Sequence, residues 1–170
     1  MTNSEQADRV LHAVHEGVHV LRFTGEIRYP LGPALERFLD QLLNEKPPGL
    51  IIDLCETRII DSTCLGLLAH LALQLRALGL AKAKVVSPQP DITEVLRSMS
   101  FDRLFEIIGE MPFSPAEARE LETDIGREED TLLATMLGAH RALMVLSEHN
   151  RLQFRDVVKV LERESEVHHG

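Results

Sequence analysis

Three consecutive residues, Asp61, Ser62 and Thr63, stand directly in front of a long apolar segment. All three types are favoured at the start of a helix, where a side-chain oxygen accepts a hydrogen bond from a free backbone N–H. The helix dipole also favours negative charge there. Ser62 is therefore a candidate phosphoacceptor, with Thr63 as a secondary candidate whose main expected role is capping. On this triplet alone, an ordinary helix cap is the more common explanation.

The histidines and acidic residues indicate no second reactive centre. His12, His15 and His19 have a spacing that would gather metal ligands on a helix, but the pattern around them predicts two strands. The sequence contains no glycine-rich nucleotide loop, no nucleophile elbow and no plausible pair of catalytic acids. We therefore expect no metal site, no cofactor and no catalytic residue, and we interpret the chain as a protein that is not an enzyme.

The elements around the triplet are predicted from hydrophobic patterning. Residues 50–54 form a short, continuous apolar run, which is typical of a strand covered on both faces and parallel to a neighbour. Helical spacing follows from about residue 61 to Gly79, with leucines around most of the circumference. One narrow stripe of polar or small residues extends from Ser62 along this helix: Thr63, Gly66, His70 and Gln74. A partner could pack close to the backbone at Gly66.

The remaining pattern predicts alternating strands and helices. Residues 9–15 and 17–24 alternate apolar with polar positions and indicate a hairpin, and a helix is expected from about 33 to 44. A strand over 83–87, a helix over 90–99 and a final strand over 104–108 complete the series. The expected fold class is α/β. A loop with Gly25, Glu26 and Arg28 follows the hairpin and is either solvated or a partner contact. Asp53 is interpreted as a strand-end residue that bonds the next turn.

A polar break separates the chain into residues 1–121 and a helical extension, 122–170. Between 129 and 164, apolar residues keep a heptad-like seam that predicts one amphipathic helix, or two helices broken near His149 and Asn150. The seam positions are Leu132, Met136, Ala139, Leu143, Leu146, Asn150, Phe154, Val157 and Leu161. Three roles stay open: packing on its own domain, a homodimer through residues 129–164, or binding of a partner.

Charge and composition limit the partners. The formal net charge is −9 and the pI is about 5.3, which opposes nucleic acid or an anionic membrane as the main partner and favours a basic or amphipathic protein. The only cysteines, Cys55 and Cys64, lie in the central apolar region and are interpreted as reduced packing residues. No targeting or membrane-spanning pattern is found, so we expect a cytoplasmic protein.

The strand and helix order β-β-α-β-α-β-α-β, with D-S-T-C-L-G opening the second helix, resembles the STAS domain of bacterial anti-sigma factor antagonists (anti-anti-sigma factors). The resemblance covers roughly residues 8–120 and implies a mixed sheet with helices packed on it. Two departures are Cys64 in place of a small glycine and Arg28 where an acidic residue is common. The matching residues are Gly25, Glu26, Ile27, Asp53, Asp61, Ser62, Leu65 and Gly66.

This resemblance implies a phosphoprotein that controls transcription by partner switching. Ser62 would be phosphorylated by a serine kinase, often the anti-sigma factor itself, and a serine phosphatase would restore binding. The expected partner-binding residues are Gly25, Glu26, Arg28, Asp61, Ser62, Thr63, Gly66, His70 and Gln74. The alternatives are a STAS subunit of a transporter or lipid-transport complex that docks without phosphorylation, and a small-molecule-binding α/β domain.

Overall fold

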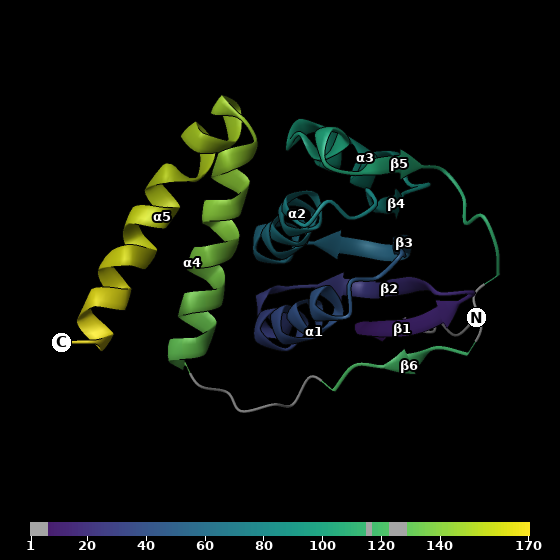
Figure 1. Cartoon of the computed structure of the whole chain (residues 1–170). Helices are drawn as coiled ribbons and strands as arrows, with labels where there is room; N and C mark the ends of the chain where they lie inside the picture. Colours follow the sequence, from purple (N-terminus) through teal and green to yellow (C-terminus); the bar gives the residue numbers. More distant parts are fainter. Residues whose placement is uncertain (1–6, 115–116, 123–128) are drawn as a thin grey trace, which may run out of the picture.

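A computed structural model describes residues 7–114, 117–122 and 129–170. Its centre is one six-stranded mixed sheet with the strand order β5-β4-β3-β2-β1-β6 (Figure 1). The strands are β1 (Arg9–His15), β2 (Val18–Ile27), β3 (Gly49–Ile60), β4 (Lys84–Val86), β5 (Glu106–Ile108) and β6 (Arg119–Glu120). The mixed α/β fold and the order of its first five strands confirm the prediction from the sequence.

The pairing of the strands follows their connections. β1 and β2 form an antiparallel hairpin, whose turn has positive φ at Glu16 and Gly17, as a tight two-residue turn requires. β2, β3, β4 and β5 are mutually parallel along the sheet because a helix connects each successive pair. β6 pairs antiparallel with β1 at the opposite edge from β5. β5 was predicted to be the final strand, and this was wrong, since a two-residue strand leaves no periodic signal.

Helices cover one face of the sheet. They are α1 (Gly32–Asn44), α2 (Ser62–Ala77) and α3 (Pro90–Ser98), with short 3₁₀ turns at Tyr29–Leu31 (η1) and Phe101–Arg103 (η2). Figure 1 shows α1 and α2 side by side against the strands, and their buried leucines belong to the main core. The predicted helix bounds agree with these to within a few residues.

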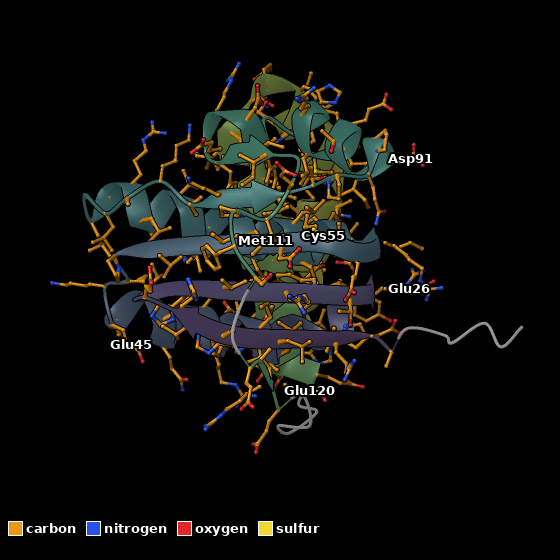
Figure 2. All side chains as sticks on the ribbon, turned by 90° about the vertical axis from the view of Figure 1, so that its right-hand side faces the viewer. Glu26, Glu45, Cys55, Asp91, Met111 and Glu120 are labelled. Atoms are coloured by element: carbon orange, nitrogen blue, oxygen red, sulfur yellow. The ribbon has the colours of Figure 1, made fainter. Side chains whose placement is uncertain are left out.

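The other face of the sheet is covered in part by residues 109–114, which follow β5. Met111 and Phe113 pack there against Val20 and Ile51, and Figure 2 shows Met111 beside Cys55 on this face. Residues 50–54 of β3 are buried throughout. The prediction that this strand is covered on both faces is therefore confirmed.

β2 and β3 are longer than their apolar patterns, which changes two expectations. Gly25 and Glu26 belong to β2 and not to a loop. Asp53 lies inside β3 instead of at its end, and its carboxylate accepts hydrogen bonds from Arg22 Nε at 3.2 Å and from the Cys55 N–H at 3.0 Å. The register of the β2–β3 ladder shifts after Arg22, which pairs with Asp53. At this irregularity the Asp53 carboxylate accepts the hydrogen bond from the Cys55 N–H. Burial, together with the nearby Asp53, raises the pKa of the Cys55 thiol to about 12.

The extension forms a helical hairpin that packs on its own domain. Its helices are α4 (Glu129–Leu146) and α5 (Glu148–His168), and α4 lies between α2 and α5 (Figure 1). The chain breaks at Ser147, slightly earlier than expected, because the Ser147 hydroxyl accepts a hydrogen bond from the Asn150 N–H at 3.0 Å and caps α5. The first of the three roles is the one that this structure shows.

The predicted seam is partly correct in both helices of the extension: in α4, Ala139 and Leu143 are buried, but Leu132, Met136 and Leu146 are only half-buried and Leu137, which was not on the seam, is buried. Ala139, Leu143 and Phe154 are buried in the same core as α2. Val157 is 42% exposed, and Val158 is buried in its place. Between the cap and Leu161 the buried positions follow the repeat of a straight α-helix, whereas the prediction used the slightly shorter heptad repeat of a coiled coil. The main core is thus continuous from the sheet into the hairpin. The boundary between residues 121 and 122 stays a prediction, and most of the polar break lies outside the described residues.

Candidate phosphoacceptor site

Asp61 fixes the start of α2. Its Oδ1 accepts a hydrogen bond from the Cys64 N–H at 2.9 Å, which is the geometry of an N-cap. Its Oδ2 accepts from the Tyr29 N–H, and its own N–H donates to the Ile27 carbonyl at 3.0 Å. One residue therefore ties the start of α2 to the chain that leaves β2. The capping role expected for Thr63 belongs to Asp61.

Ser62 is the first residue of α2 and is half-buried. Its Oγ lies 2.9 Å from Nε2 of His140, which comes from α4. The other ring nitrogen of His140, Nδ1, lies 2.7 Å from the Met136 carbonyl oxygen, which can only accept. In the neutral ring Nδ1 therefore carries the hydrogen, and the Ser62 hydroxyl donates to Nε2. The candidate phosphoacceptor is thus held by a side chain of the hairpin.

His140 is a residue of the site that sequence reasoning missed. It is 3% exposed and packs edge-on against Phe154, with ring centroids 5.6 Å apart. Its place beside Ala139, at the edge of the predicted seam, was a usable signal that it could be buried, and a buried polar side chain needs a hydrogen-bond partner. Nothing in the sequence could show that this partner is Ser62, 78 positions earlier.

α4 covers the stripe that was expected to face a partner protein. A Cβ added at Gly66 would lie 2.2 Å from the Ala139 carbonyl oxygen, so the two helix backbones meet at this glycine. Thr63 is 3% exposed. Further along α2, Gln74 is half-buried and His70 is exposed. The expectation of an open stripe was therefore wrong for its first half, because the chain's own helix occupies it.

α4 also contacts α1. The Thr135 hydroxyl donates to Glu36 Oε2, and a Cβ added at Gly32 would lie 3.2 Å from Thr135 Cγ2. Both glycines, Gly32 and Gly66, therefore allow the close approach of one helix. Figure 1 shows α4 lying across α1 and α2.

The end of β2 lies beside this site. Arg28 Nε donates to Glu26 Oε2 at 3.1 Å, and the Glu26 N–H donates to Asp8 Oδ1 at 2.8 Å. Gly25 has a φ of 76°, which favours glycine. The hydrogen bonds of Asp61 hold this segment next to α2, so the structure brings Gly25, Glu26 and Arg28 close to the start of the helix.

The arrangement at Ser62 positions a hydroxyl but does not complete a catalytic triad. His140 Nδ1 binds a backbone carbonyl, where a triad has a carboxylate.

The other cysteine and histidine side chains form no second reactive centre among the described residues. Burial, and then the neighbouring Asp61, raises the pKa of the Cys64 thiol. His12 and His19 meet at 2.9 Å, whereas His15 stacks on Phe113. Among the described residues, no cluster of three or more His, Cys, Asp or Glu side chains has the arrangement of a metal site.

A family model of the STAS domain matches residues 10–118, which include the strands around the site and the whole of α1, α2 and α3. The chain belongs to the STAS domain family. The match ends before α4, so the hairpin that covers Ser62 lies outside the matched part of the domain. No described helix of this STAS protein is long and apolar enough to cross a membrane.

Solved structures support the same assignment. An anti-sigma factor antagonist from Mycobacterium paratuberculosis is similar, with a TM-score of 0.53 and 25% sequence identity over 65% of this chain and 92% of that one. A Thermotoga maritima protein described as a candidate anti-sigma factor antagonist has a TM-score of 0.54 and 21% identity, over 59% of this chain and 86% of that one, which shows the shared fold. A comparison with curated proteins found no match.

Proposed function

We propose that this protein is a phosphorylation-controlled anti-sigma factor antagonist. The unphosphorylated form binds an anti-sigma factor or a similar regulator, and phosphorylation of Ser62 releases it. The kinase is the regulator itself or a separate serine kinase, and a serine phosphatase restores binding. In this proposal the chain acts by binding and not by catalysis, in the cytoplasm.

The position of Ser62 is the observation that carries the proposal. In a chain of the STAS family, with an anti-sigma factor antagonist among its structural neighbours, the serine is the first residue of α2. Asp61 already satisfies the Cys64 N–H, so the Ser62 hydroxyl is not needed as a cap. A phosphate at this position would be stabilised by the helix dipole. Phosphorylation would therefore leave α2 folded and act on binding.

The size of the effect on binding follows from charge and shape. A phosphate adds about −1.5 to −2 charges and three acceptor oxygens at pH 7. The phosphate would stand near Gly66, where in this structure the backbone of α4 approaches α2 closely. A loss of about 1.4 kcal/mol lowers affinity tenfold, so a small misfit is enough to release a regulator. The chain's net charge of −9 fits a regulator with a basic or amphipathic surface.

The test is a pull-down from native cells with tagged full-length protein. Wild type and Ser62→Ala should retain the same regulator, and Ser62→Asp should lose it, because the carboxylate places a charge at the phosphoacceptor position. Ser98→Asp is the matched control, since Ser98 is exposed on α3, outside the candidate site. It should bind as wild type does.

Equal recovery of the regulator by wild type, Ser62→Ala and Ser62→Asp would contradict the phosphoswitch. That result would favour docking without phosphorylation, as in a transporter-associated STAS subunit. Because Ser98→Asp carries the same added charge, it separates an effect at Ser62 from a general effect of acidity.

A further inference from the structure

The hairpin occupies the face of α2 that the proposed function assigns to a regulator. Ser62 is bonded to His140, and Gly66 is covered by Ala139. The distance of 2.2 Å between a Cβ at Gly66 and the Ala139 oxygen leaves no room for a second helix. A regulator that packs at Gly66 and α4 cannot be bound there at the same time.

The contact between α4 and the domain has the features of a docked helix. Small side chains meet the two domain glycines, Thr135 at Gly32 and Ala139 at Gly66, so the backbones can approach, and Ala142 of the same helix is buried in the main core. Polar pairs flank this apolar contact, with His140 on Ser62 and Thr135 on Glu36. The family match ends at residue 118, so the docked helix is additional to the matched domain.

We infer that the α4–α5 hairpin is an internal competitor that holds the Ser62 face closed, and that a regulator binds by placing a helix with small residues where α4 lies. This inference rests on the proposed function for the assignment of that face to a regulator. A further part of the inference is that a kinase or a regulator reaches Ser62 only after α4 has separated from α2. The free energy of α4 docking on α2 then sets the affinity that a regulator must exceed.

The covalent link between hairpin and domain explains why this competition is effective. A segment tethered in the same chain acts at an effective concentration on the order of millimolar. A helix added from solution at micromolar concentration therefore loses to an equally good internal helix. Weakening only the internal copy should open the face to the same helix supplied from outside.

The experiment uses a fluorescent synthetic peptide of residues 129–168 and full-length protein. In Ala139→Leu, the larger side chain meets Gly66 and disfavours docking of the internal α4, while the domain face is unchanged. In Gly138→Leu, the same side chain is added at the adjacent exposed position, where a Cβ has no neighbour within 4 Å. Fluorescence anisotropy should show that Ala139→Leu binds the peptide at least about tenfold more tightly than wild type or Gly138→Leu do.

A second pair of variants keeps the test valid if Ala139→Leu does not fold. His140→Ala removes the hydrogen bond to Ser62 and the contact with Phe154, and His149→Ala removes an exposed histidine from the start of α5. His140→Ala should also bind the peptide more tightly than its control, by a smaller factor. Equal peptide binding by both members of each folded pair would overturn the inference.

The two proposals can fail separately. Peptide binding involves neither phosphate nor a regulator, so it tests the competing hairpin alone. If phosphate is found on Ser62 while peptide binding does not depend on Ala139 or His140, the hairpin is a fixed part of the domain and the inference is wrong. If peptide binding depends on these residues and Ser62 is never phosphorylated, the proposed switch is wrong and the helix-docking face remains.

Discussion

Gly66 is the residue where the shape of the site is most sharply defined. It lies one helical turn after Ser62, and only the absence of a side chain lets the Ala139 carbonyl approach. A glycine inside a helix is otherwise unfavourable, by about 0.5–1 kcal/mol relative to alanine. The docked helix requires this absence of a side chain in α2.

Replacing Gly66 by alanine should therefore destabilise the protein, although alanine favours helices. The added methyl group would overlap the Ala139 carbonyl, and such overpacking costs about 1–3 kcal/mol. Gly138→Ala is the matched control, because the position is exposed and free of neighbours, and it should gain up to about 1 kcal/mol from helix propensity. Urea denaturation of both variants checks this. A Gly66→Ala variant as stable as Gly138→Ala would mean that α4 does not lie on Gly66.

The residue types in the sequence indicated the α2 part of this site but not the α4 part. Asp61, Ser62 and Gly66 were singled out because their types match the start of a helix and a close approach. His140 was missed, since its role depends on how the hairpin folds back, and spacing along one helix carries no information about that. Thr63 was assigned a capping role because three good capping residues in a row do not show which one takes the cap.

At the scale of elements, the β1–β2 hairpin brings two histidines together. The Nε2 of His12 lies 2.9 Å from Nδ1 of His19, and Phe38 from α1 contacts the His12 ring edge-on. Burial lowers the pKa of His12, and the charge of a protonated His19 lowers it further, while Glu45, which lies 4.0 Å from His19, partly opposes this. The folded hairpin therefore disfavours protonation of His12.

Stability should fall as the pH decreases through the ordinary histidine pKa of 6.5. The unfolded chain binds a proton at His12 more readily than the folded protein does, so acidification favours unfolding until the lowered pKa is passed. In His12→Gln this contribution is absent. Its free energy of unfolding, measured between about pH 7.5 and about pH 5.5, should fall less than that of wild type. Parallel curves for the two proteins would show that His12 is not held in its neutral form.

The predictability of the elements follows from the length of their patterns. β1, α1 and α2 have long periodic segments, and they were predicted with nearly correct bounds, whereas β2 continues to Ile27, three residues past its predicted end. β6 consists of two residues and has no pattern of its own, so it is recognised only by its pairing with β1 in the structure. In α5 the heptad spacing was extended past the cap at Ser147, which predicted Val157 in place of Val158.

At the scale of the molecule, one core joins the sheet, α2 and the hairpin. Phe154 of α5 and Leu143 of α4 are buried with Leu65 and Leu68 of α2. The amphipathic seam showed that the extension must bury an apolar face, but it did not show which surface would receive it. The answer depends on tertiary fit at Gly32 and Gly66, and a seam pattern does not contain it.

The proposed switch depends on phosphorylation of Ser62. The most direct measurement is intact-mass spectrometry of the protein purified from its native cells, with and without phosphatase treatment, followed by fragmentation to separate Ser62 from Thr63. We expect one fraction heavier by a single phosphate, located on Ser62 and removed by phosphatase, and no such fraction in Ser62→Ala. A protein without phosphate in every growth condition, or with phosphate that persists in Ser62→Ala, would contradict the proposed switch.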